Sequence, residues 1–130
     1  MRTVQKEKDL SSCEKMIMKI VWDAKGDIPT PEVIEQIKTK YGKDYARTTV
    51  ATFIQRLIEK GFVTTYRRGR IAYIHAERDE KQYTLNFLKH IREFWFQGQL
   101  TSLFSALCEE SKPTAEEVEQ LRKLIDEMDH

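Results

Sequence analysis

Hydrophobic residues recur at helical spacing in two segments near the start of the chain, and each segment opens on a helix-capping pattern. Ser11 can cap the first helix while Glu14, three residues later, reaches back to the cap. Thr30 is expected to cap the second helix, with Pro31 in the first turn, where proline is tolerated, and Gly42 at its end. The inward-facing positions of the two helices are Met16, Ile17, Ile20, Val21, Val33, Ile34 and Ile37.

A third helix is predicted from Ala46 or Arg47 to Lys60, and its two faces differ in chemistry. The buried stripe consists of Val50, Phe53, Ile54 and Leu57. At about 100° per residue, the positions opposite this stripe are Thr48, Thr52, Gln55 and Glu59, with Ala51 and Arg56 on the flanks. Hydroxyl, carboxamide and guanidinium groups on an exposed helix face can hydrogen-bond base edges and phosphates.

The segment after the third helix alternates hydrophobic and polar residues and predicts a two-stranded hairpin. Its strands are residues 62–68 and 71–75, and Arg67, Arg68 and Arg70 gather around the turn. Three short helices followed by a hairpin predict a winged helix-turn-helix, whose third helix lies in the DNA major groove. The arginines could form an ordinary solvated tip, but their mutual repulsion favours phosphate binding.

Beyond residue 78 the hydrophobic pattern is helical throughout. One apolar face runs over residues 83–95 and another over residues 100–107. Lys112-Pro113 interrupts the pattern, and Thr114 then caps a last helix with Glu117 completing a second capping box. The fold class expected for the whole chain is therefore mainly α, with a small β-hairpin wing and a C-terminal helical region.

These patterns predict two domains. Residues 1–78 are expected to form a winged-helix DNA-binding domain, and residues 79–130 a helical dimerisation domain. The second segment is too short and too hydrophobic to bury its own apolar surface, so it either folds back on the first or pairs with a second copy. We favour a homodimer, because a winged helix gains useful specificity from two half-sites. The residues expected to join the copies are Phe87, Ile91, Phe94, Trp95, Leu100, Leu103, Phe104, Leu107, Leu121 and Ile125.

The net charge of +1 conceals a division along the chain. Residues 1–78 hold 16 Lys and Arg against 10 Asp and Glu, whereas residues 79–130 hold 6 against 11. Most of the positive excess lies within residues 43–72. A basic half joined to an acidic half indicates a polyanion-binding face, although a dipolar solvated surface would give the same count.

Other classes of protein find little support. No run approaches the ~18 apolar residues of a membrane span, and residues 1–9 lack the apolar stretch of a signal peptide. Cys13 and Cys108 lie far apart, which favours free thiols in a reducing cytoplasm. No histidine shares a metal-ligand spacing with a cysteine, and no glycine-rich phosphate loop is present. We therefore expect no enzyme, no metal or other cofactor, and no direct membrane insertion.

Three segments resemble the penicillinase-repressor and methicillin-resistance-repressor family, which also includes copper-transport repressors. They are the opening helix of residues 10–22, the third-helix pattern of residues 49–61 and the wing of residues 67–74. The resemblance implies a dimeric bacterial repressor on an operator of inverted-repeat half-sites. It places the operator contacts of the third helix on Thr48, Thr49, Thr52 and Arg56, and the backbone contacts on the wing arginines. Some members of the family carry a basic residue where this chain has Ala51.

The resemblance also implies two routes for relief of repression. In the antibiotic-responsive branch, a membrane sensor-protease triggers cleavage at an Asn-Phe pair inside the dimerisation helices, where this chain has Ala106-Leu107. The copper branch uses paired Cys-x-Cys motifs, whereas this chain has only Cys108 near its C-terminus. The inducing signal therefore stays open.

Together these patterns predict a cytoplasmic transcriptional repressor that binds double-stranded operator DNA as a homodimer. The competing interpretation is a winged-helix protein-interaction module that never touches DNA; it would not need the basic charge on the third helix and wing. The residues expected to contact DNA are Arg47, Thr48, Thr49, Thr52, Gln55, Arg56, Arg67, Arg68 and Arg70.

Overall fold

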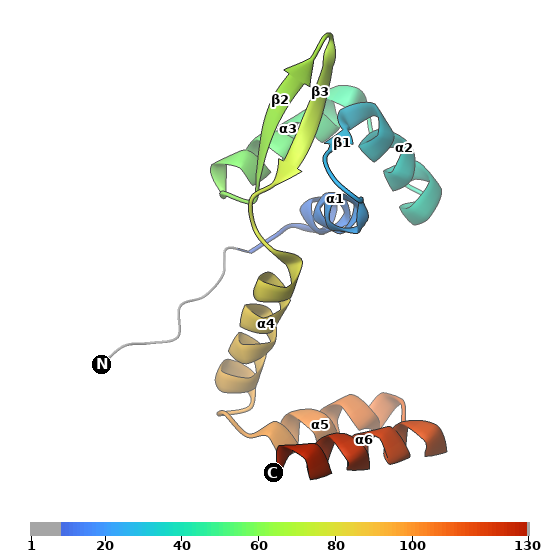
Figure 1. The fold of residues 1–130 in the computed structure, drawn as a ribbon, viewed down its shortest axis with the longest axis vertical. Helices are drawn as coiled ribbons and strands as arrows, with labels where there is room; N and C mark the ends of the chain where they lie inside the picture. The colour runs from blue at the N-terminus through green and yellow to red at the C-terminus, as the bar shows by residue number, and fades with distance from the viewer. Residues whose placement is uncertain (1–8, 130) are drawn as a thin grey trace, which may run out of the picture. The chain divides into compact units, whose positions relative to one another are not determined.

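The computed structural model describes residues 9–129, which form two compact units with a boundary between Phe87 and Leu88. Figure 1 shows the elements of the first unit, which are α1 (Ser12–Asp23), β1 (Ile28–Pro29), α2 (Thr30–Tyr41), α3 (Arg47–Glu59), β2 (Val63–Arg68), β3 (Ile71–Ala76) and the larger part of α4 (Glu80–His90). The second unit adds a π-helical turn, η1 (Ile91–Trp95), and two helices, α5 (Leu100–Glu110) and α6 (Ala115–Met128).

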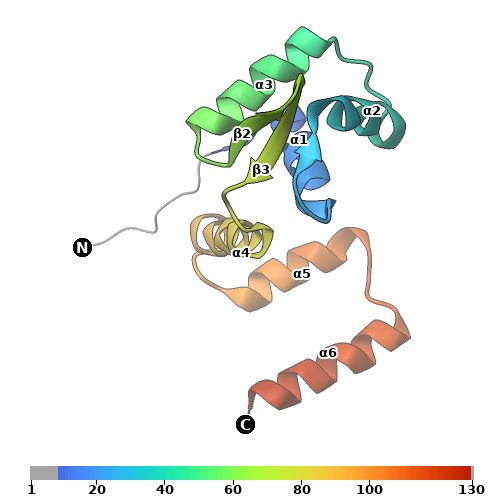
Figure 2. The same cartoon turned by 45° about the horizontal axis from the view of Figure 1, so that its top comes forward.

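The three strands form an antiparallel sheet in the order β1-β3-β2. Tyr66 on β2 lies opposite Tyr73 on β3, and Ile28 on β1 lies opposite Ile74. In Figure 1 the tip of the β2–β3 hairpin extends beyond the helices, and in Figure 2 α3 runs alongside the hairpin. This arrangement confirms the winged helix-turn-helix expected from the sequence. The short strand β1, which that pattern did not predict, ties the hairpin to the segment between α1 and α2.

The two predicted capping boxes are present, but the predicted cap of α2 is wrong. In α1 the backbone N–H of Glu14 donates to Ser11 Oγ at 3.2 Å, and the Ser11 N–H donates to the Glu14 carboxylate at 2.8 Å. The N-cap of α2 is Pro29 rather than Thr30. Pro29 is extended as part of β1, and the helix begins at Thr30, one residue earlier than predicted. The Thr30 hydroxyl instead donates to the carbonyl of Ala72 on β3, at 3.0 Å.

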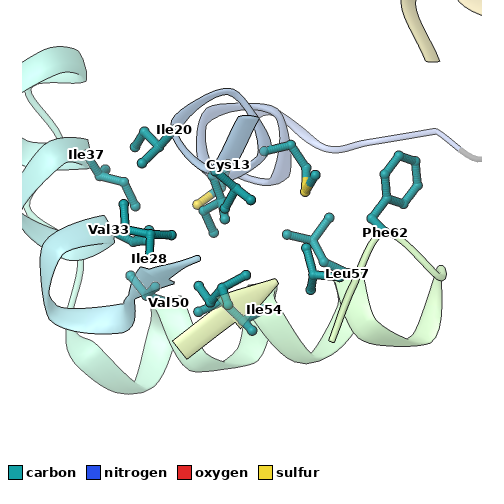
Figure 3. Packing of buried hydrophobic residues seen from close by; sticks show 14 of the residues in the cluster. Cys13, Ile20, Ile28, Val33, Ile37, Val50, Ile54, Leu57 and Phe62 are labelled. Atoms are coloured by element: carbon teal, nitrogen blue, oxygen red, sulfur yellow. The ribbon is translucent and has the colours of Figure 1, made fainter. Parts of the chain in front are cut away.

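One hydrophobic core lies among α1, α2, α3 and the sheet. Figure 3 shows Val50, Ile54 and Leu57 projecting from α3 toward α1, and their exposed fractions are 0%, 6% and 0%. The fourth residue of the predicted stripe, Phe53, is only half-buried and packs at the edge of this cluster. Cys13 is a buried free thiol within the same core. The inward seam of α3 therefore fixes which side of that helix faces solvent.

An ion pair between the partly exposed Lys60 and the buried Glu14 joins the C-terminal end of α3 to α1. The ammonium group of Lys60, which caps α3, lies 2.7 Å from a carboxylate oxygen of Glu14, a residue only 1% exposed. Burial by itself raises the pKa of Glu14, but the hydrogen bonds from Lys60 and Ser11 outweigh that effect and hold the pKa below its ordinary value. Glu14 thus caps one helix and anchors another.

Aromatic side chains join the start of α4 to the rest of the first unit. The ring of Tyr83 lies 5.6 Å from that of Trp22 and 5.5 Å from that of Phe62, measured between centroids. The indole N–H of Trp22 donates to the carbonyl of Arg78 at 2.8 Å. The segment that follows the wing is therefore held to the winged helix over the first turns of α4.

The second unit contains a local departure from the predicted helical face of residues 83–95. Its last five residues form the π-helical turn η1 rather than a continuation of α4. Gln97 and Gly98 then adopt positive φ angles of 48° and 80°, and the N–H of Gly98 donates to the carbonyl of Arg92 at 2.8 Å. Trp95, at the end of the turn, is 66% exposed.

The predicted capping box of α6 is confirmed, with the N–H of Glu117 bonded to Thr114 Oγ1 at 3.1 Å.

Candidate nucleic-acid interface

The solvent-facing side of α3 carries a contiguous stripe of small and polar residues. Thr48, Ala51, Thr52 and Gln55 are all exposed and follow the spacing i, i+3, i+4 and i+7. We call this set the α3 stripe. Its existence agrees with the predicted orientation of the helix, since the buried residues Val50, Ile54 and Leu57 occupy the opposite side.

Two members of the α3 stripe differ in their free hydrogen-bonding capacity. The hydroxyl of Thr52 donates to the main-chain carbonyl of Thr48, at 3.0 Å, so its hydrogen is used within the helix. The carboxamide of Gln55, in contrast, makes no hydrogen bond to any other residue between 9 and 129. Gln55 thus retains its donors and acceptor for an external partner.

The wing presents its arginines to solvent. Arg67, Arg68 and Arg70 are all exposed, and Gly69 allows the tight turn between them with a φ of 64°. Arg67 donates from its guanidinium to the Arg70 carbonyl at 3.2 Å. The guanidinium of Arg68 lies over two aromatic rings, 5.1 Å from the centroid of Tyr73 and 5.6 Å from that of Tyr66.

A groove of about 460 Å³ separates α3 from the wing. Among its lining residues are Arg47 and Gln55 from α3 and Arg67 and Arg70 from the hairpin. Apolar side chains, including Ile54, and two threonines, Thr30 and Thr65, form the rest of its wall. Four of the residues predicted to bind DNA therefore surround one concave, cationic surface, which can accept a phosphate-bearing backbone.

The other predicted residues do not line this groove. Thr49 is only half-buried near the start of α3. Arg56 is exposed on the opposite flank, where its guanidinium lies 5.5 Å from the centre of the Phe53 ring. These two residues, with the exposed Thr48 and Thr52, extend the predicted contact surface along α3 away from the wing.

An acidic residue that sequence reasoning did not single out holds the base of the wing. Asp27, in the loop between α1 and β1, accepts a hydrogen bond from the Tyr66 hydroxyl at 2.6 Å. Its other carboxylate oxygen lies 2.8 Å from Nδ1 of His75. The bond from Tyr66, followed by that from His75, lowers the pKa of Asp27, and the same contacts raise the pKa values of Tyr66 and His75.

The register of the hairpin could have revealed part of the cluster formed by Asp27, Tyr66 and His75. Tyr66 and Tyr73 are cross-strand partners, and His75 is two residues further along β3, so the three share one face of the hairpin. The position of Asp27 depends instead on β1, a strand of two residues with no pattern of its own. Sequence reasoning therefore had no means of bringing its carboxylate to the wing.

Apolar side chains remain exposed over much of the C-terminal unit. Of the residues predicted for dimerisation, Ile91, Leu103 and Leu121 are half-buried and the others are exposed. Phe94, Trp95 and Leu107 are more than three-fifths exposed, at 61%, 66% and 66%. A groove of about 360 Å³ between α5 and α6 is lined in part by Phe104, Leu107 and Cys108. Phe87 belongs to the first unit and stacks on Tyr83.

Metal-binding clusters and membrane-spanning helices are both absent from the part of the chain that the structure describes. Across residues 9–129, no three His, Cys, Asp or Glu side chains gather closely enough to hold a metal ion. Over the same range, no helix combines the length and apolar character needed to cross a bilayer.

The first unit defines a winged-helix protein with a polar recognition helix and a cationic wing. The chain matches the penicillinase repressor family over residues 10–127, and it belongs to that family. This is a family of transcriptional repressors rather than of enzymes. The assignment confirms both the resemblance seen in the sequence and the expectation of a non-enzymatic protein.

Proteins with similar sequences include a named regulator of methicillin resistance and a named penicillinase repressor. The methicillin resistance regulatory protein MecI of Staphylococcus aureus (strain N315) is 26% identical over 117 residues, which cover 90% of this chain and 93% of that protein. The penicillinase repressor of Bacillus licheniformis is 25% identical over 124 residues, covering 95% and 94%. The solution structure of the DNA-binding domain of the repressor BlaI is 29% identical, covers 61% of this chain and 93% of that domain, and superposes with a TM-score of 0.51.

Proposed function

We propose that this chain is a cytoplasmic, sequence-specific repressor that binds an inverted-repeat operator as a homodimer. In this proposal α3 enters the major groove and the wing lies along the neighbouring phosphates. The observation that carries it is the α3 stripe beside a groove that holds Arg47, Arg67 and Arg70. Membership of the penicillinase repressor family supports the same function.

The residues of the interface take different tasks. The carboxamide of Gln55 is a group that can form two hydrogen bonds with an adenine edge, and its side chain has no competing partner within residues 9–129. The arginines at the groove and the wing tip contact phosphates, which contribute affinity without reading sequence. Thr48, Thr49 and Arg56 extend the contact along the helix.

The exposed apolar residues of the C-terminal unit support pairing of two copies. Phe94, Trp95 and Leu107 would be costly to leave in water, and a self-complementary interface would cover them in both copies. Two winged helices joined in this way would occupy half-sites about 34–36 Å apart, one turn of DNA. Release of the operator would then follow from disruption of this unit, and a membrane sensor-protease is one trigger that the family resemblance suggests.

A salt titration tests the proposal. The full chain is used to select duplexes from random DNA, and its affinity for the selected duplex is measured at several salt concentrations. The logarithm of the affinity should fall linearly with the logarithm of salt, with a slope of about −0.9 for each phosphate neutralised. Selection of no preferred sequence together with a flat salt response would contradict the proposal. Light scattering on the free chain tests the dimer separately.

A further inference from the structure

The centre of the α3 stripe presents methyl groups rather than hydrogen-bond donors. Ala51 is exposed and ends in a methyl group. The neighbouring Thr52 is also exposed, but its hydroxyl hydrogen is donated to the Thr48 carbonyl at 3.0 Å. Outside the helix, Thr52 can therefore offer only its γ-methyl group and the acceptor lone pairs of its oxygen. The two adjacent residues form a small apolar patch on an otherwise polar face.

Such a patch suits one base more than the other three. In the major groove, thymine alone exposes a methyl group, on C5, whereas the other bases present only donors and acceptors. A donor pressed against the methyl groups of Ala51 and Thr52 would lose its water without gaining a partner there, because a methyl group accepts no hydrogen bond. Contact with a thymine methyl group carries no such penalty and buries apolar surface on both sides.

We propose that Ala51 and Thr52 are specificity-determining residues that recognise the C5-methyl group of a thymine in each half-site. The proposal rests on the proposed function, because it requires α3 to lie in the major groove. Gln55 follows Ala51 by four residues and Thr52 by three, so its free carboxamide reads a base close to this thymine. The methyl group of Thr52, and not its hydroxyl, makes the contact.

The probe is the palindromic duplex that the full-length chain selects from random DNA. Each thymine is replaced by deoxyuridine, one symmetric pair of positions at a time, so that only methyl groups are removed and base pairing is kept. Affinity is measured by fluorescence anisotropy. At one pair of positions the affinity should fall by about fourfold for each methyl group removed, and substitution elsewhere should have little effect.

Two variants at position 52 separate the methyl group from the hydroxyl. Thr52→Ser keeps the hydroxyl bonded to the Thr48 carbonyl but removes the methyl group, so its preference for the thymine duplex over the deoxyuridine duplex should be smaller than that of the unmodified chain. Thr52→Val removes the hydroxyl but keeps a methyl group, so it should still prefer thymine. Thr84→Ser is the matched control, because Thr84 is an exposed helical threonine on α4 whose hydroxyl also donates to a main-chain carbonyl, at 3.1 Å. Its thymine preference should equal that of the unmodified chain.

The outcomes distinguish this inference from the proposed function. A reduced thymine preference in Thr52→Ser with full retention in Thr52→Val supports the methyl contact. The reverse pattern, or a selected duplex in which no deoxyuridine substitution changes affinity, overturns it while leaving the DNA-binding function intact. Failure of the chain to select any duplex overturns both.

Discussion

The hydroxyl group of Tyr66 donates to the carboxylate of Asp27 across 2.6 Å, joining the wing to the loop that follows α1. His75 contacts the second oxygen of the same carboxylate at 2.8 Å. One acidic side chain therefore bridges both strands of the hairpin to the helical part of the winged helix. Because Arg68 lies over Tyr66 and Tyr73, the bridge also fixes the platform beneath a predicted phosphate-binding residue.

Removal of the bridge should weaken DNA binding without removing any group that touches DNA. In Asp27→Ala, the wing loses both bonds at its base and must be ordered when DNA binds, so affinity should fall about fivefold. The slope of affinity against salt should stay unchanged, because the wing arginines are intact. Asp23→Ala is the matched control: Asp23 is an exposed acid at the end of α1 that pairs with Lys19 at 3.3 Å. An equal loss of affinity in both variants would show that removal of any surface carboxylate weakens binding, and would contradict a specific role for the Asp27 bridge.

The contact between Asp27 and His75 should make the stability of the fold depend on pH. The hydrogen bond that His75 donates to the Asp27 carboxylate raises the pKa of His75 above 6.5, so the stabilisation that His75 contributes is complete below pH 6.5 and disappears as pH rises through the raised value. The pKa of Asp27 is lowered from 3.8, so its contribution is complete above pH 3.8 and disappears as pH falls through the lowered value. The melting temperature of the unmodified chain should therefore exceed that of Asp27→Asn most between pH 3.8 and 6.5.

Proton NMR provides the direct check on that pair. The titration midpoint of the His75 ring in Asp27→Asn should move down toward 6.5, the ordinary histidine value. A midpoint that does not change on this substitution would contradict the contact between the two side chains.

Residues at the wing tip should contribute affinity without selectivity. Replacing Arg68 or Arg70 with alanine should weaken binding to all duplexes alike and reduce the salt slope by about 0.9 for each phosphate that is no longer neutralised. Gln55→Ala should instead change the order of preference among duplexes. Arg122→Ala, an exposed arginine on α6, is the control. Unequal effects of Arg70→Ala on different duplexes at constant salt would assign this arginine to base recognition instead.

The ion pair between Lys60 and Glu14 at the end of α3 should respond differently to loss of each partner. Lys60→Met leaves the carboxylate of Glu14 buried without its cation and should lower the free energy of unfolding by about 3 kcal/mol. Glu14→Gln removes the charge but keeps an oxygen that can accept from the Ser11 N–H, so it should cost less. Urea denaturation measures both values, and a smaller loss for Lys60→Met than for Glu14→Gln would contradict the ion pair.

A charge placed on the exposed face of α5 should separate the proposed dimer. Leu107→Glu puts a carboxylate where the proposed interface needs an apolar group, and the mass measured by light scattering should halve. Ser105→Glu introduces the same charge at another exposed position of α5 and should leave the mass unchanged. If Leu107→Glu retained the mass of two copies, α5 would not belong to the interface.

The sequence predicted the parts of the fold that local pattern determines. Ser11 with Glu14, and Thr114 with Glu117, show the capping-box spacing, and both boxes form. The inward positions Val50, Ile54 and Leu57 repeat at helical spacing, so the outward face of α3 followed from them. Periodicity therefore places the predicted DNA-contacting face with no knowledge of tertiary structure.

The hydrophobic and polar pattern of the sequence could not predict contacts between distant segments. Thr30 has the residue type of an N-cap, yet its hydroxyl is taken by Ala72, a residue 42 positions away. The π-helical turn at Ile91–Trp95 keeps a helical hydrophobic pattern while changing the backbone hydrogen bonding. In Thr52 the side-chain type was known, but only the bond to the Thr48 carbonyl shows which of its groups is available to a base.

The chain has two tryptophans, and each unit contains one of them. Trp22 is fixed by its bond to the Arg78 carbonyl, whereas Trp95 is largely open to water. Intrinsic fluorescence therefore offers two spectroscopic reporters without labelling. Self-association should shift the emission of Trp95 to shorter wavelength, and unfolding of the winged helix should alter that of Trp22, so single-tryptophan variants can time the two events independently.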